Sequence, residues 1–153
     1  MREITLQNNK KIYIFENVLS KDICLKWVEE VDAMKQHIEE NKRLADEVFQ
    51  TVGEAIGGYP FSTKGPRVEV NLAKRGTGIH PHFDIIYGGE KWRVLCYLNE
   101  ISNGGTDFQD GKEWFHINAS MGTVLIFDIS LYHRGALNQE NKKKYTIGIR
   151  LLE

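Results

Sequence analysis

The hydrophobic pattern of the first 58 residues predicts one strand followed by two amphipathic helices. The segment Lys11 to Phe15 (KIYIF) alternates between polar and apolar positions, which is typical of a strand. Ser20 can cap a first helix, in which Ile23, Trp27, Val28, Val31 and Met34 recur at helical spacing. A second helix is expected from about residue 41 to residue 56, ending at Gly57-Gly58. Its apolar residues stand four apart on one face: Leu44, Val48, Val52 and Ile56.

The stretch between these helices, Lys35 to Lys42 (KQHIEENK), is polar throughout. This pattern fits a loop between two helices, and it also fits the exposed part of one long helix. His37 lies in this stretch, and we interpret it as a surface histidine.

From Arg67 onward the pattern changes to short β-branched or aromatic runs separated by turn residues, which is typical of antiparallel strands. Gly88-Gly89, Asn103-Gly104-Gly105 and Asp110-Gly111 are examples of these turns. The expected strands are 67–72, 92–98, 106–108, 114–117, 123–127 and 145–152, within a set of about eight. The chain is therefore predicted to be mainly β with N-terminal helices (α+β), as a sandwich or jelly roll supported on one side by the helices.

Length and composition agree with one soluble unit. With 153 residues, 41% of them hydrophobic and 27% charged, we expect a single domain with residues 1–58 as support and residues 67–152 as the jelly-roll core. The net charge of −1 disfavours nucleic acid and anionic membranes as partners. The short run Lys142-Lys143-Lys144 is typical of a solvated turn, at least for two of its three lysines.

The two cysteines, Cys24 and Cys96, lie far apart within apolar segments, which indicates buried reduced thiols. The first ten residues (MREITLQNNK) contain no apolar signal region, and no apolar run approaches the roughly 20 residues that span a bilayer. We therefore expect a cytoplasmic protein with no membrane contact.

The candidate chemistry begins at Gly78-Ile79-His80-Pro81-His82-Phe83-Asp84 (GIHPHFD). Side chains two apart in a strand point to the same face, so His82 and Asp84 could share one metal ion. A third ligand could come from a later strand, and His133 directly follows the strand expected at 123–127. Two histidines and one carboxylate on one face of an octahedral ion form the facial triad of non-haem Fe(II) oxygenases.

Around these residues the chain carries a series of ordered motifs. Gly76 stands six residues before His82, and Pro81 directly precedes it. Then follow Tyr97-Leu98-Asn99, Gly104-Gly105-Thr106 with Phe108, Met121-Gly122-Thr123 leading to Phe127, His133 and Lys144-Tyr145-Thr146. In this order the chain resembles the Fe(II)- and 2-oxoglutarate-dependent dioxygenases, in particular their prolyl 4-hydroxylase-like branch. The resemblance covers roughly Arg67 to Leu152, and a weaker likeness covers KIYIFENVLSKDIC.

The resemblance implies a double-stranded β-helix fold in which His82, Asp84 and His133 hold Fe(II). It also implies that Lys144, with Thr146 and the Tyr97 hydroxyl, binds the distal carboxylate of the cosubstrate 2-oxoglutarate. Lys144 lies eleven residues after His133, one more than is usual in the family, so Lys143 is the alternative. A buried dianion needs a cation and hydroxyl donors to offset its desolvation, which agrees with this set.

The implied reaction is hydroxylation of an unactivated C–H bond, with O2 as a further cosubstrate, ascorbate as an additional candidate cofactor, and succinate and CO2 as products. No catalytic side chain beyond the metal centre is expected. The substrate is a peptide, a protein or a small molecule, and a prolyl or other residue in a peptide is favoured. The alternative is a non-catalytic, cupin-like jelly roll that binds a metal or ligand.

Two departures from the family pattern concern the predicted pocket. Ala73 occupies a position where many relatives have a tyrosine, and Asn71 could supply part of the missing hydrogen bonding. Arg150 stands where an aromatic residue is common, either as part of the pocket wall or extending into solvent.

Overall fold

The computed structural model describes residues 1–33, 42–59, 67–73, 81, 90–136 and 143–152. Its helices are α1 (Lys21–Ala33) and α2 (Lys42–Ala55). Its strands are β1 (Arg2–Thr5), β2 (Lys11–Phe15), β3 (Arg67–Ala73), β4 (Glu90–Tyr97), β5 (Gly105–Asp110), β6 (Glu113–Asn118), β7 (Val124–Asp128), β8 (His133–Gly135) and β9 (Lys144–Leu152).

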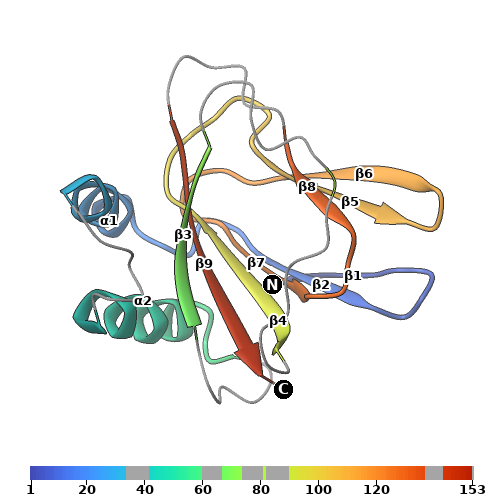
Figure 1. The fold of residues 1–153 in the computed structure, drawn as a ribbon, viewed down its shortest axis with the longest axis horizontal. Helices are drawn as coiled ribbons and strands as arrows, with labels where there is room; N and C mark the ends of the chain where they lie inside the picture. Colours follow the sequence, from blue (N-terminus) through green and yellow to red (C-terminus); the bar gives the residue numbers. More distant parts are fainter. Residues whose placement is uncertain (34–41, 60–66, 74–80, 82–89, 137–142, 153) are drawn as a thin grey trace.

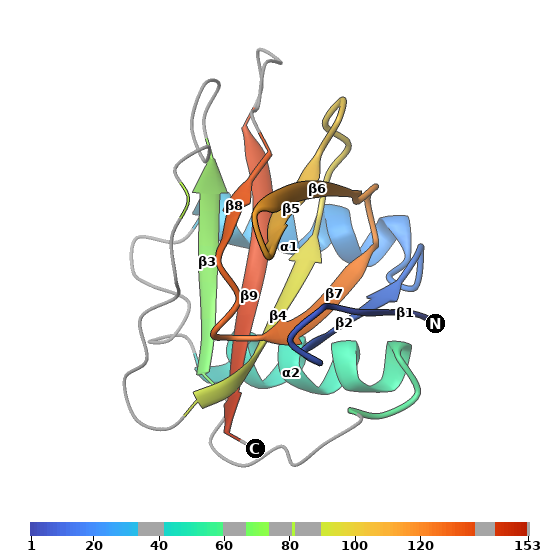
Figure 2. The same cartoon turned by 90° about the vertical axis from the view of Figure 1, so that its right-hand side faces the viewer.

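The strands form two sheets that lie one above the other. The larger sheet has six strands in the order β1-β2-β7-β4-β9-β3, and the smaller has three in the order β6-β5-β8. Each of these neighbouring pairs is antiparallel. Helices α1 and α2 cover one face of the six-stranded sheet, and the three-stranded sheet lies over its other face (Figures 1 and 2). The predicted arrangement of two N-terminal helices and antiparallel β-structure is therefore confirmed.

The helices form where the hydrophobic pattern predicts them. The Ser20 hydroxyl accepts a hydrogen bond from the Ile23 amide at 3.2 Å, which makes Ser20 the cap of α1. Two glycines with positive φ follow helix α2, Gly57 at 79° and Gly58 at 99°. The Gly58 amide donates to the Gly53 carbonyl at 2.7 Å, which satisfies a carbonyl of the last turn. The predicted stop at these glycines is confirmed.

Two hydrophobic cores hold the three layers together. The first lies between the helices and the six-stranded sheet, where the expected helical residues Trp27, Leu44 and Val48 are almost completely buried. The second lies between the two sheets and includes Tyr97, Phe108 and Phe127. Because the six-stranded sheet is covered on both faces, its central strands are buried on both sides.

All six expected strands occur, with ends that differ by at most two residues from those predicted. The strand expected at Lys11 to Phe15 is also present as β2, and it pairs with β7 in the larger sheet. The sequence pattern did not predict β1 or β8. The stretch around His37, for which we left loop and helix open, falls almost entirely outside the described residues.

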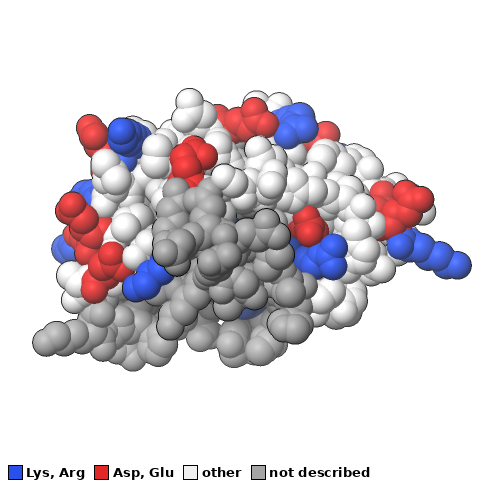
Figure 3. All heavy atoms as spheres, turned by 90° about the horizontal axis from the view of Figure 1, so that it is seen from above, with Lys and Arg blue, Asp and Glu red and all other residues white. Residues whose placement is uncertain are grey.

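The described surface carries charges of both signs. On the face in Figure 3, acidic and basic side chains lie interspersed. Among the helices that the structure describes, none is long and apolar enough to span a membrane. Cys24 and Cys96 are both buried and free, as predicted.

Candidate functional site

The two faces of β9 differ in chemistry although both are buried. Tyr145, Ile147, Ile149 and Leu151 belong to the core beneath the helices. Because side chains alternate along a strand, Lys144, Thr146, Gly148 and Arg150 face the other way, into the space between the two sheets. Lys144, Thr146 and Arg150 are only 7%, 8% and 6% exposed. We call these four residues the polar row of β9.

Lys144 lies at the beginning of this row. Its ammonium group donates to the Gly105 carbonyl at 2.9 Å and lies 5.5 Å from the centre of the Tyr97 ring. Burial lowers the pKa of Lys144 to about 8, although the charge of Asp107 acts in the opposite direction. Lys143, the alternative in the sequence, has an exposed side chain. A buried ammonium group of this kind is suited to receive an anion.

Three hydroxyl side chains belong to the same part of the interior as Lys144. The Tyr97 hydroxyl and the Thr106 hydroxyl form a hydrogen bond with each other. Thr146 is the register partner of Tyr97 across the β4–β9 pair, so both predicted hydroxyls lie in one row of the sheet. Burial raises the pKa of Tyr97, which keeps its phenol protonated and able to donate. Lys144, Tyr97 and Thr146 are therefore brought together, and Thr106 joins them although no role was predicted for it.

Asn99 fixes the backbone on which Lys144 stands. Its amide nitrogen donates to the Lys143 carbonyl at 2.7 Å, and its amide oxygen accepts from the Tyr145 backbone at 2.9 Å. These two bonds hold the residues on either side of Lys144. No role was predicted for Asn99, which belongs to the Tyr97-Leu98-Asn99 motif, and the available signal was an asparagine directly after a buried strand.

The carbonyl that accepts the hydrogen bond from Lys144 depends on the backbone conformation of Gly105. Its φ is +127°, and a Cβ at this position would lie 2.0 Å from the Ile117 carbonyl oxygen. No side chain fits there without moving the β5–β6 pair. The carbonyl that accepts from Lys144 is therefore placed by a glycine conformation.

His133 begins β8 and lies between the two sheets. It is 4% exposed, and its ring packs against Phe127 with 5.0 Å between ring centres. Its Nδ1 lies 2.8 Å from the Leu131 carbonyl, which can only accept, so Nδ1 carries the proton. In the neutral ring this tautomer leaves the lone pair on Nε2, the arrangement common in metal-binding histidines. The chemistry of His133 thus fits the predicted metal ligand.

The other two predicted metal ligands, His82 and Asp84, lie outside the residues that the structure describes. Within the described residues there is no group of three histidine, cysteine or carboxylate side chains that could hold a metal. The prediction of a three-residue metal centre therefore rests on the sequence together with the placement of His133.

The structure also locates the residues at the two departures from the family pattern, as well as Arg134, which directly follows His133. Arg150 is buried, so of the two alternatives it belongs to the interior wall and does not extend into solvent. Asn71 and Ala73 stand opposite Thr146 and Lys144 in the β3–β9 register. Arg134 donates to Asp107 at 3.0 Å.

His116 likewise has a structural partner. Its Nδ1 lies 2.7 Å from Asp107, the carboxylate that also accepts from Arg134. Asp107 follows Thr106 and precedes Phe108, both of which are buried between the sheets, so this cluster lies on the outer face of the smaller sheet. It therefore lies on the other face of β5 from the polar row of β9, although the charge of Asp107 still acts on Lys144.

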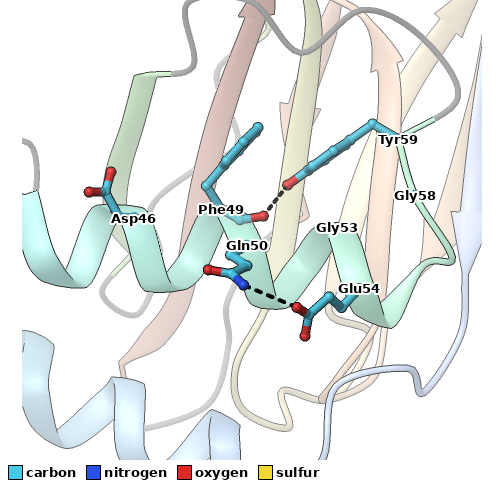
Figure 4. A pocket seen from close by; sticks show the side chains of 7 residues that line it. All are labelled: Asp46, Phe49, Gln50, Gly53, Glu54, Gly58 and Tyr59. Carbon is cyan, nitrogen blue, oxygen red and sulfur yellow. Dashed lines mark hydrogen bonds between the residues drawn. The ribbon is translucent and has the colours of Figure 1, made fainter.

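A hollow lies on the other side of the molecule, along α2. Its volume is about 700 Å³, and Tyr59 stacks on Phe49 at its wall, with 4.9 Å between ring centres (Figure 4). The Tyr59 hydroxyl donates to the Phe49 carbonyl at 2.8 Å. Its lining is Asp46, Phe49, Gln50, Gly53, Glu54, Gly58 and Tyr59. Helix α2 and the buried core beneath it separate this hollow from the polar row, so we do not assign it to the same site.

The fold resembles that of solved 2-oxoglutarate-dependent enzymes. A prolyl-4-hydroxylase from Pseudomonas putida superimposes with a TM-score of 0.67 at 14% identity, over 93% of this chain and 92% of that one. A prolyl hydroxylase from Trichoplax adhaerens, solved with a hypoxia inducible factor peptide, gives 0.64 at 16% identity, over 92% and 83%. HygX from Streptomyces hygroscopicus, solved with nickel and 2-oxoglutarate bound, gives 0.64 at 10% identity, over 92% and 81%.

Comparison by sequence gives a different result. No protein-family model matches the chain, and no curated protein sequence matches it either. The structural likeness therefore establishes the fold, a double-stranded β-helix with N-terminal helices, as expected from the motifs.

Proposed function

We propose that this protein is an Fe(II)- and 2-oxoglutarate-dependent oxygenase that hydroxylates an unactivated C–H bond and releases succinate and CO2. The observation that carries the proposal is the buried ammonium group of Lys144 with its neighbouring hydroxyls, Tyr97, Thr106 and Thr146, between the two sheets. Burying these polar groups in an apolar core would lower the stability of the fold, because buried charges need a compensating partner. A dicarboxylate bound against it supplies that compensation.

In this proposal His82, Asp84 and His133 hold the metal. The protonated Nδ1 of His133 orients its ring through Leu131, so that Nε2 is the coordinating atom. When bound, Fe(II) and 2-oxoglutarate supply the activation of O2 that a protein side chain cannot provide. The packing of His133 against Phe108 and Phe127 limits the access of water to its side of the site.

The remaining groups bind and orient the cosubstrate. Lys144 neutralises its distal carboxylate, and the Thr146 and Tyr97 hydroxyls donate to the same group. Asn99 holds the backbone on both sides of Lys144, and Gly105 places the carbonyl that accepts from the ammonium group. Each of these groups positions the cosubstrate and none transfers a proton, so the chemistry resides in the metal centre.

The proposed substrate is a residue of a peptide or protein, such as a prolyl residue, or a small molecule, and two of the three structures described above are prolyl hydroxylases. A reducing, cytoplasmic setting is also part of the proposal. Cys24 and Cys96 are free and buried, and burial raises the pKa of Cys24 to about 11, so neither thiol is poised to form a disulfide.

The alternative is a jelly-roll module that binds a ligand without turnover. A ligand-binding barrel could use the same lysine and hydroxyls to hold an anion. It would have no need for a histidine between the same two sheets that is oriented with its lone pair on Nε2. This feature favours the oxygenase.

The first test is an anaerobic titration of the protein with Fe(II) and then 2-oxoglutarate, followed by absorption spectroscopy. We expect a weak visible metal-to-ligand band when both are present, and its loss in Asp84→Ala. Addition of O2 should then release succinate. A band that survives in Asp84→Ala would reject the proposed metal ligands.

A pair of lysine variants serves as the matched control for the cosubstrate site. Lys144→Gln should lose most 2-oxoglutarate affinity, whereas Lys143→Gln should retain it, because only Lys144 is buried. Equal losses in the two variants would argue against the assignment of Lys144.

A further inference from the structure

Two buried arginines lie side by side between the sheets, at the opposite end of the polar row from Lys144. Arg93 on β4 and Arg150 on β9 are register partners and are 4% and 6% exposed. A Cβ on Gly148 would lie 2.5 Å from both Nη atoms of Arg93. The Arg93 guanidinium therefore occupies the space that a side chain at Gly148 would fill, and it faces the same interior as Lys144.

This pair lies near the proposed metal ligand on β8. Arg93 is the register partner of Phe127, and the Phe127 ring packs against His133. Strands β4 and β7 are neighbours, so a single interstrand spacing of about 4.8 Å separates the backbone of Arg93 from that of Phe127, which His133 contacts. The arginines thus stand beside the position where the substrate of a metal centre at His133 would bind.

The cosubstrate held by Lys144 does not reach this pair. Gly148 follows Lys144 by four residues, which corresponds to about 13 Å along the strand. The two carboxyl carbons of an extended five-carbon diacid are only about 5 Å apart, given C–C bonds of about 1.5 Å. A ligand bound at the arginine pair would therefore be distinct from the cosubstrate at Lys144.

Like charges directly opposite each other in a sheet repel, so a carboxylate bound near this pair would be favourable. The register also places Arg67 and Glu69 beside Arg150 and Gly148. Both buried arginines already interact within the chain. A guanidinium has five N–H donors in a planar fork, so it can bind a carboxylate in addition to an existing partner.

We propose that Arg93 and Arg150 bind a carboxylate of the substrate and so select substrates that carry one close to the reacting carbon. This inference rests on the proposed function for the location of the reacting carbon. The substrate class is then a free amino acid, a related small carboxylic acid or the carboxyl end of a peptide. An internal residue of a neutral peptide would be a poor substrate.

The test compares matched pairs of probes on the wild-type protein, loaded anaerobically with Fe(II) and 2-oxoglutarate. The probes are N-acetyl amino acids, N-acetylproline among them, and their uncharged amides, and binding is measured by ligand-observed NMR. We expect at least one acid to bind tenfold or more tightly than its amide. Equal binding of acid and amide, or no binding of any acid, would overturn the proposal without any variant.

Three variants then assign the binding to these residues. Arg150→Gln and Gly148→Ala should each weaken acid binding about tenfold, the second because its methyl group displaces the flexible end of Arg93 while both charges remain. Arg43→Gln, an exposed arginine on α2, is the matched control and should change nothing. If the two interior variants fold, as judged by their melting temperature, and still bind the acid normally, the assignment is wrong.

The 2-oxoglutarate band separates this inference from the proposed function. Arg150→Gln should keep the band, and Lys144→Gln should lose it. A wild-type protein with the band but no preference for acids would reject the arginine pair alone. Loss of cosubstrate affinity in Arg150→Gln equal to that in Lys144→Gln would place the arginines at the cosubstrate and also reject the inference.

Discussion

The affinity for 2-oxoglutarate should depend on pH through Lys144. Burial lowers the pKa of Lys144 from 10.5 to about 8, which corresponds to a bias of about 3 kcal/mol against the charged form. A dianion bound beside the ammonium group favours the charged form. Binding above pH 8 must therefore be accompanied by uptake of a proton.

The magnitude follows from this pKa. If only the protonated lysine binds the cosubstrate, the apparent affinity is nearly constant below pH 7 and falls tenfold per pH unit well above pH 8. Between pH 7 and pH 9 we expect a loss of about tenfold. At pH 8 about half a proton should be taken up for each bound molecule.

Anaerobic calorimetry of the Fe(II)-loaded protein measures both quantities, when the titration is repeated in buffers of different ionisation enthalpy. Lys144→Arg is the matched control, because a guanidinium stays charged over the whole range. Any pH effect at the metal is common to both proteins, so the difference between them isolates the lysine. A wild-type protein with no more pH dependence than Lys144→Arg would refute the reasoning.

Three further outcomes follow from the same contacts. Lys144→Met should stabilise the ligand-free protein at pH 7 by up to about 3 kcal/mol. This advantage should shrink between pH 8 and 10.5 in chemical denaturation, because the unfolded wild type binds more protons than the folded one in that window. Asn99→Ala removes two hydrogen bonds and should lower the free energy of unfolding by about 1–3 kcal/mol. It should also weaken 2-oxoglutarate binding. An unchanged affinity would mean that Asn99 does not position Lys144. Gly105→Ala should lower the melting temperature strongly, and a melting temperature close to that of the wild type would contradict the described backbone conformation.

The sequence pattern predicted the helices and strands that bury one face and expose the other. The four-residue spacing of Leu44, Val48 and Val52 corresponds to the buried face of α2. Strand β1 (Arg2–Thr5) lies at the sheet edge and is mostly exposed, so it has no apolar alternation to detect. Strand β8 has only three residues, which is too short for a periodic pattern.

The candidate site shows a different limit of prediction from sequence. The alternation of polar and apolar residues in β9 is the usual pattern of a strand with one face in water. Here both faces are buried, and the polar face lines the interior. The sequence could therefore not decide between a wall position and solvent for Arg150. It also left Lys143 and Lys144 open, because their difference in burial depends on where β9 begins: Lys144 is its first residue and is buried, whereas Lys143 precedes the strand and is exposed.

The central claim is that the polar row of β9 holds 2-oxoglutarate next to a metal on His133. The most direct test is a crystal structure of the protein with Fe(II) and 2-oxoglutarate, prepared without O2. We expect the metal on His133 Nε2, His82 and Asp84, with the distal carboxylate about 2.8 Å from the Lys144 ammonium group. A metal bound without His133, or a cosubstrate bound away from Lys144, would contradict the account.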